Sequence, residues 1–203
     1  MWPPIELRDA VHARRSTADL GSGRLTAADV SLVLAAAAGI TGEIEGPAGT
    51  PIAGRAAPSG GGLFPLDLFV LPLRCDGIAA GICRYDPERH ALEELPAPPR
   101  PIDLGSELAG IVYQQEIATT AALVVVLAAT FARSRVKYGL RAYRHVLLEA
   151  GHVAQGGLVA AAAAGLRSVP IGGFIDRRLE RLLGLDGVRE TVVHAFAVGR
   201  AAE

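Results

Sequence analysis

The chain has few cysteines and almost no net charge, and both shortages exclude broad classes of protein. Cys75 and Cys83 are its two cysteines among 203 residues, which is too few for a disulfide framework or a cysteine zinc site. The formal net charge is −1, so the chain lacks the basic surplus of a general nucleic-acid or membrane-surface binder. We therefore expect neither nucleic acid nor a membrane among its partners.

Long hydrophobic runs are also missing, although 50% of the residues are hydrophobic. The longest apolar stretches, 121–129 and 156–166, are too short to cross a bilayer. The first residues contain no apolar signal segment. Half of 203 residues is enough apolar material for the large core of one domain. The sequence thus predicts a single domain over residues 1–203 in the cytoplasm.

Several well-known catalytic and nucleotide-binding motifs are absent. No GxGxxG follows a predicted strand, and the chain contains neither GxSxG nor GxxxxGK followed by serine or threonine. These absences argue against a Rossmann unit, a phosphate-binding P-loop and an α/β-hydrolase nucleophile. HExxH is missing as well, and we expect no metal site.

What the chain does contain is a run of three glycines between two prolines. The segment 55–65 reads RAAPSGGGLFP and leads directly into the apolar run 66–73. Glycine allows positive φ angles and lets the backbone come close to a bound molecule, while proline fixes the ends of such a loop. We interpret Pro58 to Gly62 as a ligand-binding loop held by the strand that follows. The alternative is a flexible surface loop.

The order of predicted elements favours an α+β fold. Helices are expected at 6–14, 26–38, 104–115, 136–164 and 176–183, and strands at 67–73, 80–85, 91–95, 121–129 and 191–198. Segment 39–54 is expected to be a loop, and the proline-rich segment 96–101 a stiff connector. No repeated βαβ unit is visible, which argues against a doubly wound sheet.

Two adjacent arginines and a serine follow the first predicted helix. The guanidinium groups of Arg14 and Arg15 suit phosphate oxygens, and Ser16 can add a hydrogen bond. The alternative is a solvated pair of cations at a helix C-terminus. A second glycine-containing segment, Val169 to Phe174, suits close approach to a planar ligand, or else an ordinary turn between helices.

Lys137 and Tyr138 are candidate catalytic residues. Neighbours on a regular helix do not share a face, so both reach one site only at a helix start or where the chain is irregular. A lysine at a helix N-terminus is disfavoured as a cation, which would lower its pKa and suit a general base. The alternative is a lysine whose stem lies along the surface beside a half-buried tyrosine.

One stripe of the long predicted helix carries two histidines and a carboxylate. His145, Glu149 and His152 are spaced i, i+4 and i+7, a geometry that can hold a metal ion. Because no HExxH and no cysteine partner accompanies them, we favour hydrogen-bonded histidines in the core or at an interface.

Taken in chain order, these motifs resemble the flavin nitroreductase family. The resemblance is greatest to its SagB/ThcOx-type (McbC-like) azoline dehydrogenase branch. It covers nearly the whole chain, and its individual motifs are weak but occur in the right order. The matching segments are 14–16, 58–66, 85–90, 137–145, 149–155, 168–174 and 198–200.

The resemblance implies a nitroreductase-like α+β fold with a mostly antiparallel central sheet flanked by helices and a long central helix. It also implies a homodimer with FMN in a cleft at the dimer interface. Arg14 and Ser16 would then hold the FMN phosphate with Arg15 beside them, and Lys137 and Tyr138 would be catalytic. The full set of implied cofactor-binding residues is Arg14, Arg15, Ser16, Pro58, Ser59, Gly60, Gly61, Gly62, Pro170, Ile171, Gly172, Gly173 and Arg200.

Members of that branch oxidise thiazoline or oxazoline rings in modified peptides, so the resemblance implies a peptide substrate and cyclodehydratase partners. Two departures stand out. Ala18 occupies a position where many relatives carry a further cation, and the chain ends shortly after Arg200. The alternatives are an NAD(P)H-dependent nitro- or quinone reductase and a flavin-free scaffold protein that keeps the fold.

Overall fold

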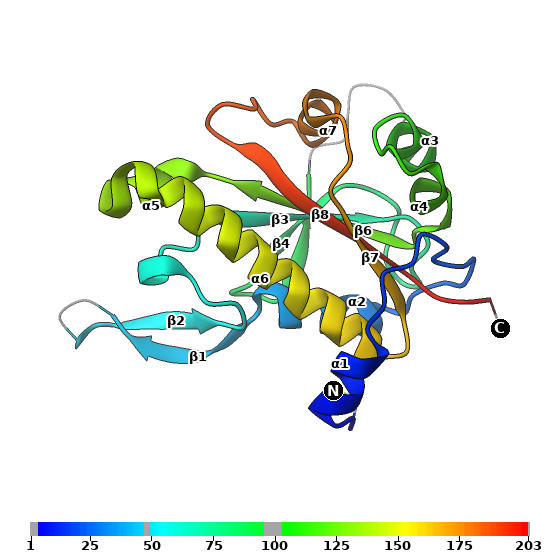
Figure 1. Ribbon diagram of the computed structural model, residues 1–203, viewed down its shortest axis with the longest axis horizontal. Helices are drawn as coiled ribbons and strands as arrows, with labels where there is room; N and C mark the ends of the chain where they lie inside the picture. The colour runs from blue at the N-terminus through cyan, green and yellow to red at the C-terminus, as the bar shows by residue number, and fades with distance from the viewer. Residues whose placement is uncertain (1–3, 47–48, 96–102, 203) are drawn as a thin grey trace.

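The computed structural model describes residues 4–46, 49–95 and 103–202, so the expected connector 96–101 lies outside the described residues. The helices and strands alternate irregularly along the chain (Figure 1). The α-helices are α1 (Leu7–Ala13), α2 (Ala27–Ala38), α3 (Leu104–Ala109), α4 (Gln115–Thr120), α5 (Phe131–Tyr138), α6 (Ala142–Ala163) and α7 (Asp176–Leu183), and short 3-10 turns are η2 (Gly60–Gly62) and η3 (Gly139–Arg141). The strands are β1 (Ile40–Glu45), β2 (Pro51–Arg55), β3 (Leu66–Pro72), β4 (Cys83–Asp86), β5 (Ala91–Glu94), β6 (Leu123–Ala129), β7 (Arg167–Ile171) and β8 (Thr191–Gly199).

Six strands form one central sheet in the order β5-β4-β3-β6-β8-β7, and a separate two-stranded sheet joins β1 to β2. Every pair of neighbours in the central sheet is antiparallel. The predicted α+β fold with an antiparallel sheet, flanking helices and a long helix is therefore confirmed.

Helices cover both faces of this sheet, and β6 shows it most clearly. All seven residues of β6 are buried. Leu123, Val125 and Leu127 face a core shared with α2 and α6, whereas Val124 and Val126 face a core shared with α3, α4 and α7. Since successive side chains of a strand point to opposite faces, a strand covered on both sides reads as one continuous apolar run.

The central helix α6 crosses one face of the sheet diagonally (Figure 1). Its glycines allow close packing: a Cβ on Gly156 would lie 2.3 Å from the Ala36 carbonyl oxygen of α2, and one on Gly157 would lie 2.8 Å from the Phe196 ring of β8. Gly151 has open space instead. The helical stretch Phe131–Ala163 is long and apolar enough to cross a membrane by length and composition, but 56% of its apolar window is buried, as in a core helix.

Three expected elements differ from the structure. Segment 39–54 is largely the β1–β2 hairpin rather than a loop. The helix expected at 104–115 is shorter, because α3 ends at Ala109 with Gly110 as its cap, and a further helix, α4, begins only at Gln115. The helix expected at 136–164 is interrupted at Gly139, whose φ of +55° does not fit an α-helix.

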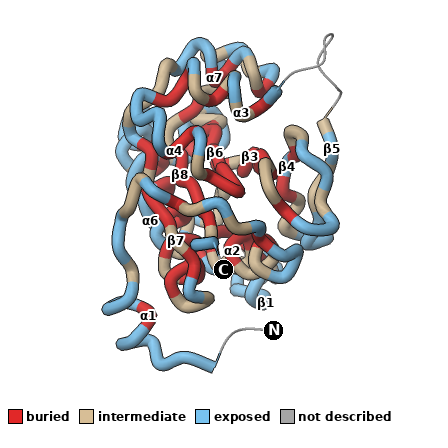
Figure 2. Tube along the Cα trace, turned by 90° about the vertical axis from the view of Figure 1, so that its right-hand side faces the viewer, coloured by how far each residue is buried: buried red, intermediate tan, exposed pale blue. Residues whose placement is uncertain are grey.

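Helix α1 lies at the periphery of the molecule, where it contacts α6. Figure 2 shows it almost entirely exposed, and Ala10 is its one buried residue. The exposed side includes Leu7 and Val11. The segment after α1 returns to the sheet, where Ser16 forms a parallel bridge with Ser168 at the start of β7.

Candidate active site

The glycine loop begins where β2 ends and makes a tight turn before β3. Gly61 and Gly62 have φ angles of +67° and +66°, and Phe64 has a φ of +42°. Glycine adopts such angles at no steric cost, which explains consecutive glycines here. The Ser59 hydroxyl accepts a hydrogen bond from the Phe64 backbone N–H at 2.9 Å and so closes the turn.

Lys137 and Tyr138 meet at this loop. A Cβ built on Gly61 would lie 2.7 Å from Lys137 Nζ and 2.7 Å from the Tyr138 hydroxyl oxygen. The two residues are sequence neighbours, and they reach one point because α5 ends at Tyr138 and the chain turns at Gly139. Both residues can serve one site only at a helix start or where the backbone is irregular, and the backbone here is irregular.

The expected helix N-terminus at Lys137 is wrong. Lys137 lies in the last turn of α5, so it is not at the N-terminal, positive end of a helix dipole. The sequence argument for a base created by a helix N-terminus therefore fails. Lys137 is nonetheless distinctive, because it is the only lysine among the 20 lysine and arginine residues of the chain.

The histidine and carboxylate stripe of α6 does not converge on one point. His145 packs against the Tyr138 ring, with ring centroids 4.9 Å apart. Glu149 is 6% exposed and accepts a hydrogen bond from Ser59 Oγ at 2.9 Å. Burial raises the pKa of Glu149, while hydrogen bonds from Ser59 and Gly60 and the charge of Arg55 oppose that rise. His145 and Glu149 thus belong to the glycine-loop site.

The second glycine segment is partly a strand. Pro170 and Ile171 lie on β7 and pair with β8, so the expected loop begins only at Gly172. Strand β7 is an edge strand, and an edge accommodates a proline, which has no N–H to donate. Gly172 has open space where a side chain would stand, so a planar molecule can approach the backbone there.

Tyr113 is a residue that sequence reasoning missed. It lies between α3 and α4, donates its backbone N–H to the Gly173 carbonyl oxygen at 3.0 Å, and is 70% exposed. A Cβ on Gly173 would lie 3.0 Å from its ring. No local pattern marks this tyrosine, because its place beside Gly173 results from pairing between distant segments.

Arg14 and Ser16 lie together at the start of β7. Arg14 donates to the Ser16 hydroxyl at 3.2 Å, and Ser16 pairs with Ser168. Arg15 turns back to the carbonyl oxygens of His12 and Arg14, at 2.6 and 2.8 Å. The Arg14 and Ser16 side chains therefore lie within hydrogen-bond distance of each other, while the Arg15 side chain satisfies carbonyl groups at the end of α1.

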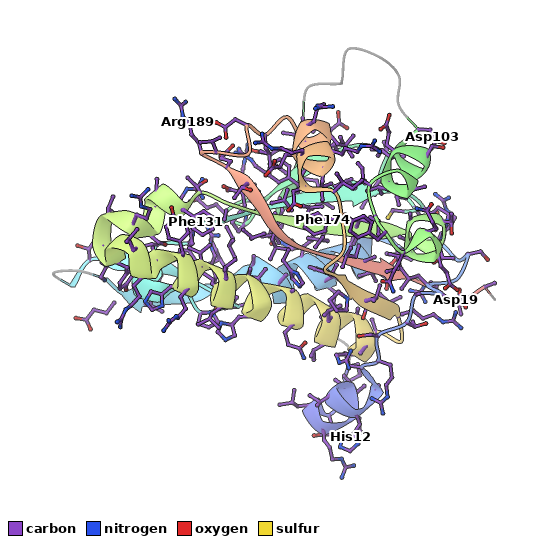
Figure 3. All side chains as sticks on the ribbon, turned by 45° about the horizontal axis from the view of Figure 1, so that its top comes forward. His12, Asp19, Asp103, Phe131, Phe174 and Arg189 are labelled. Atoms are coloured by element: carbon purple, nitrogen blue, oxygen red, sulfur yellow. The ribbon has the colours of Figure 1, made fainter. Side chains whose placement is uncertain are left out.

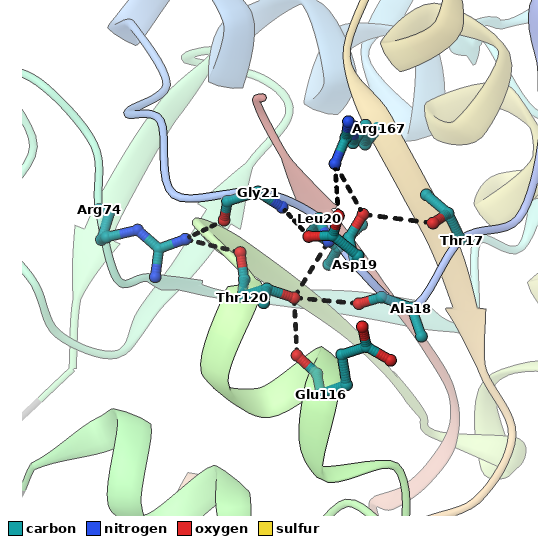
Figure 4. Close-up of polar contacts among 9 residues, drawn as sticks. All are labelled: Thr17, Ala18, Asp19, Leu20, Gly21, Arg74, Glu116, Thr120 and Arg167. Atoms are coloured by element: carbon teal, nitrogen blue, oxygen red, sulfur yellow. Dashed lines mark hydrogen bonds and ion pairs between the residues drawn. The ribbon is translucent and has the colours of Figure 1, made fainter. Parts of the chain in front are cut away.

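The segment after Ser16 is held firmly in place (Figure 4). Thr120 accepts from the Leu20 N–H and donates to the Ala18 carbonyl oxygen, each at 3.0 Å. Arg167 forms an ion pair with Asp19 at 2.8 Å. Position 18 carries alanine where many relatives have a cation, and Arg200 does not point there to replace it. The Arg200 side chain instead donates to Asp29 at the N-terminus of α2, at 2.7 Å.

The two halves of the candidate site lie at opposite ends of α6. The glycine loop is tied to Glu149 in the first half of the helix, whereas Arg14 and Ser16 lie beside Ser168, beyond its C-terminus. Glu149 and Ala163 alone are separated by about 21 Å along the axis at 1.5 Å per residue. In Figure 3, His12 and Asp19, which flank Arg14 and Ser16 in the chain, lie near one end of α6, and Phe131 lies near the other.

Within one chain, however, Ser16 pairs with Ser168 of β7, and this strand leads directly to the second glycine segment. Gly172 follows the end of β7, four residues after Ser168, or about 13 Å at roughly 3.3 Å per residue. The structure therefore places Arg14 and Ser16 beside β7, which leads to the open backbone at Gly172. It places Lys137 and Tyr138 beside the glycine loop, near the other end of α6.

Comparison with known proteins identifies the family of this chain. The Nitroreductase family model matches residues 11–200, and the chain belongs to the nitroreductase family of flavin oxidoreductases. The nitroreductase-type protein MJ1384 of Methanocaldococcus jannaschii is 32% identical over 98% of this chain and 93% of its own length. A nitroreductase-type structure from Ralstonia eutropha JMP134 is 29% identical, with a TM-score of 0.76 over 98% of this chain and 84% of that chain.

Two more distant structures share the fold. One is the E. coli microcin synthetase McbBCD complex with truncated pro-MccB17 bound, which matches at 22% identity and a TM-score of 0.72 over 96% of this chain and 73% of that chain. The other is a nitroreductase-type protein of Desulfovibrio desulfuricans in complex with FMN, at 20% identity and a TM-score of 0.64 over 98% of this chain and 88% of that chain.

Proposed function

We propose that this protein is an FMN-dependent oxidoreductase that dehydrogenates thiazoline or oxazoline rings in a modified peptide. The observation that carries the proposal is the convergence of Lys137 Nζ and the Tyr138 hydroxyl on Gly61. Ring dehydrogenation needs a base to remove a proton, and an amine beside a phenol can supply one. Transfer of a hydride from a nicotinamide to an acceptor needs no such base.

The residues present fit an FMN molecule. Arg14 and Ser16 would hold its phosphate, and Gly172 leaves room for its ring above the end of β7. Pro170, Ile171 and Gly173 would line the same surface. FMN, when bound, supplies the two-electron acceptor of the reaction. Lys137 would take the proton from the substrate carbon, and Tyr138 would orient Lys137 and the substrate by hydrogen bonding.

We further propose that the site is completed by a second copy of the chain. The glycine loop and the pair Arg14 and Ser16 lie at opposite ends of α6, so one chain by itself does not surround one cofactor. The exposed face of α6 carries Leu147, Leu148 and the open Gly151. Such a face suits pairing with a second α6 related by a two-fold axis.

Mixed dimers test this arrangement. At an FMN concentration that saturates the wild-type protein but not Arg14→Ala, Arg14→Ala and Lys137→Ala are each expected to be nearly inactive alone, since each homodimer is impaired in one part of both sites. Random pairing of the two variants should restore about one quarter of wild-type activity, because half of the dimers are mixed and each keeps one intact site. No recovery in dimers that are demonstrably mixed would show that both parts serve the same chain's site.

The second candidate is an NAD(P)H-dependent nitro- or quinone reductase, which the nitroreductase names of the relatives favour. Lys137→Ala separates the two. Azoline oxidation should fall by about 100-fold or more when a general base is lost, while NAD(P)H-driven quinone reduction should survive. If azoline oxidation also survives, the assignment of the base is wrong.

A third candidate is a flavin-free scaffold, and it is tested by a visible absorption spectrum after loading with FMN and dialysis. Flavin bands near one FMN per chain are expected, and a colourless protein would favour the scaffold. A cyclodehydratase partner and a cytoplasmic location complete the proposal. The McbBCD complex, which holds a peptide precursor together with several subunits, supports a peptide-modifying assembly.

A further inference from the structure

Glu149 is a buried carboxylate that the proposed reaction does not use. It is 6% exposed and lies in the first half of α6. Its Oε2 atom accepts a hydrogen bond from Ser59 Oγ at 2.9 Å, and its side chain also accepts from the Gly60 backbone N–H. Burying a carboxylate is costly unless its oxygens are hydrogen-bonded, and here the glycine loop supplies both donors.

The far end of the loop is tied to the same place. The Ser59 hydroxyl that donates to Glu149 accepts from the Phe64 backbone N–H at 2.9 Å. One side chain of α6 thereby holds Gly60 directly and Phe64 through a single hydroxyl. Two of the three residues between them, Gly61 and Gly62, have no side chains that could hold the loop otherwise.

The loop needs such a tie, because its backbone is strained. Phe64 has a φ of +42°, which is rare for a bulky residue and persists only where the surroundings enforce it. The Arg55 guanidinium lies 4.3 Å from the centre of the Phe64 ring. Arg55, Phe64 and Glu149 also line one small cavity. Both the backbone and the side chain of Phe64 are thus held by neighbours of Glu149.

We propose that Glu149 is a positioning residue, which fixes the glycine loop through Ser59 and Gly60 and thereby sets the geometry of Lys137 and Tyr138. The link is the close approach at Gly61, where the loop backbone, the Lys137 amine and the Tyr138 hydroxyl meet. If the loop moved away from α6, Gly61 would no longer confine the Lys137 amine and the Tyr138 hydroxyl. The proposal rests on the proposed function for its catalytic consequence, and on the hydrogen bonds alone for the tie itself.

Two substitutions separate hydrogen bonding from charge. Glu149→Gln keeps an acceptor for Ser59 and Gly60 and should hold the loop. Glu149→Leu has similar volume and removes both acceptors. Glu180 of α7 provides the matched control, because it is 4% exposed and accepts a hydrogen bond from Thr191, away from the glycine loop.

The first measurement is amide hydrogen exchange in protein free of cofactor and substrate. We expect exchange at Gly60 to be about tenfold or more faster in Glu149→Leu, since the amide loses its acceptor, and near the wild-type rate in Glu149→Gln and Glu180→Leu. Ser59→Ala leaves Glu149 in place and removes the acceptor of the Phe64 N–H, so it should speed exchange at Phe64. Wild-type exchange at Gly60 in Glu149→Leu, or at Phe64 in Ser59→Ala, would overturn the tie.

The second measurement is turnover at saturating FMN. Glu149→Leu should lower kcat by at least about tenfold, Glu149→Gln should restore most of it, and Glu180→Leu should not match the loss. Equal losses of kcat in Glu149→Leu and Glu180→Leu would show that Glu149 contributes only to the stability of the fold. If wild-type protein binds no FMN, the proposed function fails, and the exchange rates still decide whether Glu149 holds the loop.

Discussion

Lys137 lies so close to Gly61 that a side chain at position 61 would collide with it. A Cβ on Gly61 would lie 2.7 Å from Lys137 Nζ and 3.2 Å from its Cδ, at a backbone φ of +67°. The backbone angle therefore favours glycine here, and a side chain at this position would also displace the Lys137 amine.

Gly61→Ala should accordingly impair both folding and catalysis. The left-handed backbone alone costs about 1–2 kcal/mol for alanine, and the collision forces Lys137 and Tyr138 to move. Gly77→Ala is the matched control, because Gly77 has a φ of +72° and open space around its Cα. Denaturant unfolding should show a similar strain cost in both variants, and turnover should fall in Gly61→Ala alone. Equal turnover in the two variants would contradict a site at Gly61.

Arg14→Ala should weaken the binding of FMN about 10- to 100-fold. This factor corresponds to the binding free energy that a hydrogen bond to a charged group usually contributes. Riboflavin, which lacks the phosphate, should bind both proteins equally. Titration by flavin fluorescence measures both affinities. Arg8→Ala removes an exposed cation of α1 that pairs with Asp9 and should change neither. A loss of riboflavin affinity in Arg14→Ala would mean that Arg14 does not act on the phosphate.

Glu149→Gln should change how stability depends on pH. Burial raises the pKa of Glu149 above its ordinary value of 4.5, so the folded protein holds this proton more tightly than the unfolded chain. The wild-type free energy of unfolding should therefore decline as pH rises from about 4.5 through the raised pKa. Glu149→Gln lacks that decline and should gain stability relative to wild type over the same range. Parallel pH profiles from urea unfolding would contradict the raised pKa.

Tyr113→Ala should affect the substrate more than the cofactor. Its ring is exposed above Gly173, next to the open backbone where the flavin ring is proposed to lie. Loss of an aromatic contact of about 0.5–1.5 kcal/mol corresponds to roughly a 2- to 12-fold higher KM. Tyr113→Phe keeps the ring and should keep the KM. A large loss of FMN affinity in Tyr113→Ala would instead place the ring against the cofactor.

Local signals in the sequence predicted many elements correctly. The helix expected at 26–38 is α2, which begins with a capping box of Thr26 and Asp29 and runs to Ala38. The uninterrupted apolar run at 121–129 contains the doubly covered strand β6, and the strands expected at 80–85 and 91–95 are present as the antiparallel pair β4 and β5. Capping and burial on both faces act over a few residues, so a single sequence reveals them.

Other features depended on partners that sequence spacing does not show. The β1–β2 hairpin lies where glycine and proline favoured a loop, because strand pairing outweighs local propensity. Pro170 lies in a strand because β7 is at the sheet edge. The direction of the Arg200 side chain toward Asp29 likewise depends on how β8 meets α2.

By itself, the sequence determined the α+β class, the composition of the glycine loop and the Lys137–Tyr138 dipeptide, since these follow from local pattern and residue chemistry. The tertiary structure decided which of these residues meet. It brought Lys137 and Tyr138 to Gly61 at the end of α5, buried Glu149 against Ser59, and separated Arg14 from the glycine loop by most of the length of α6. Contacts between segments far apart in the chain arise from packing of the helices on the sheet, which no single stretch of sequence encodes.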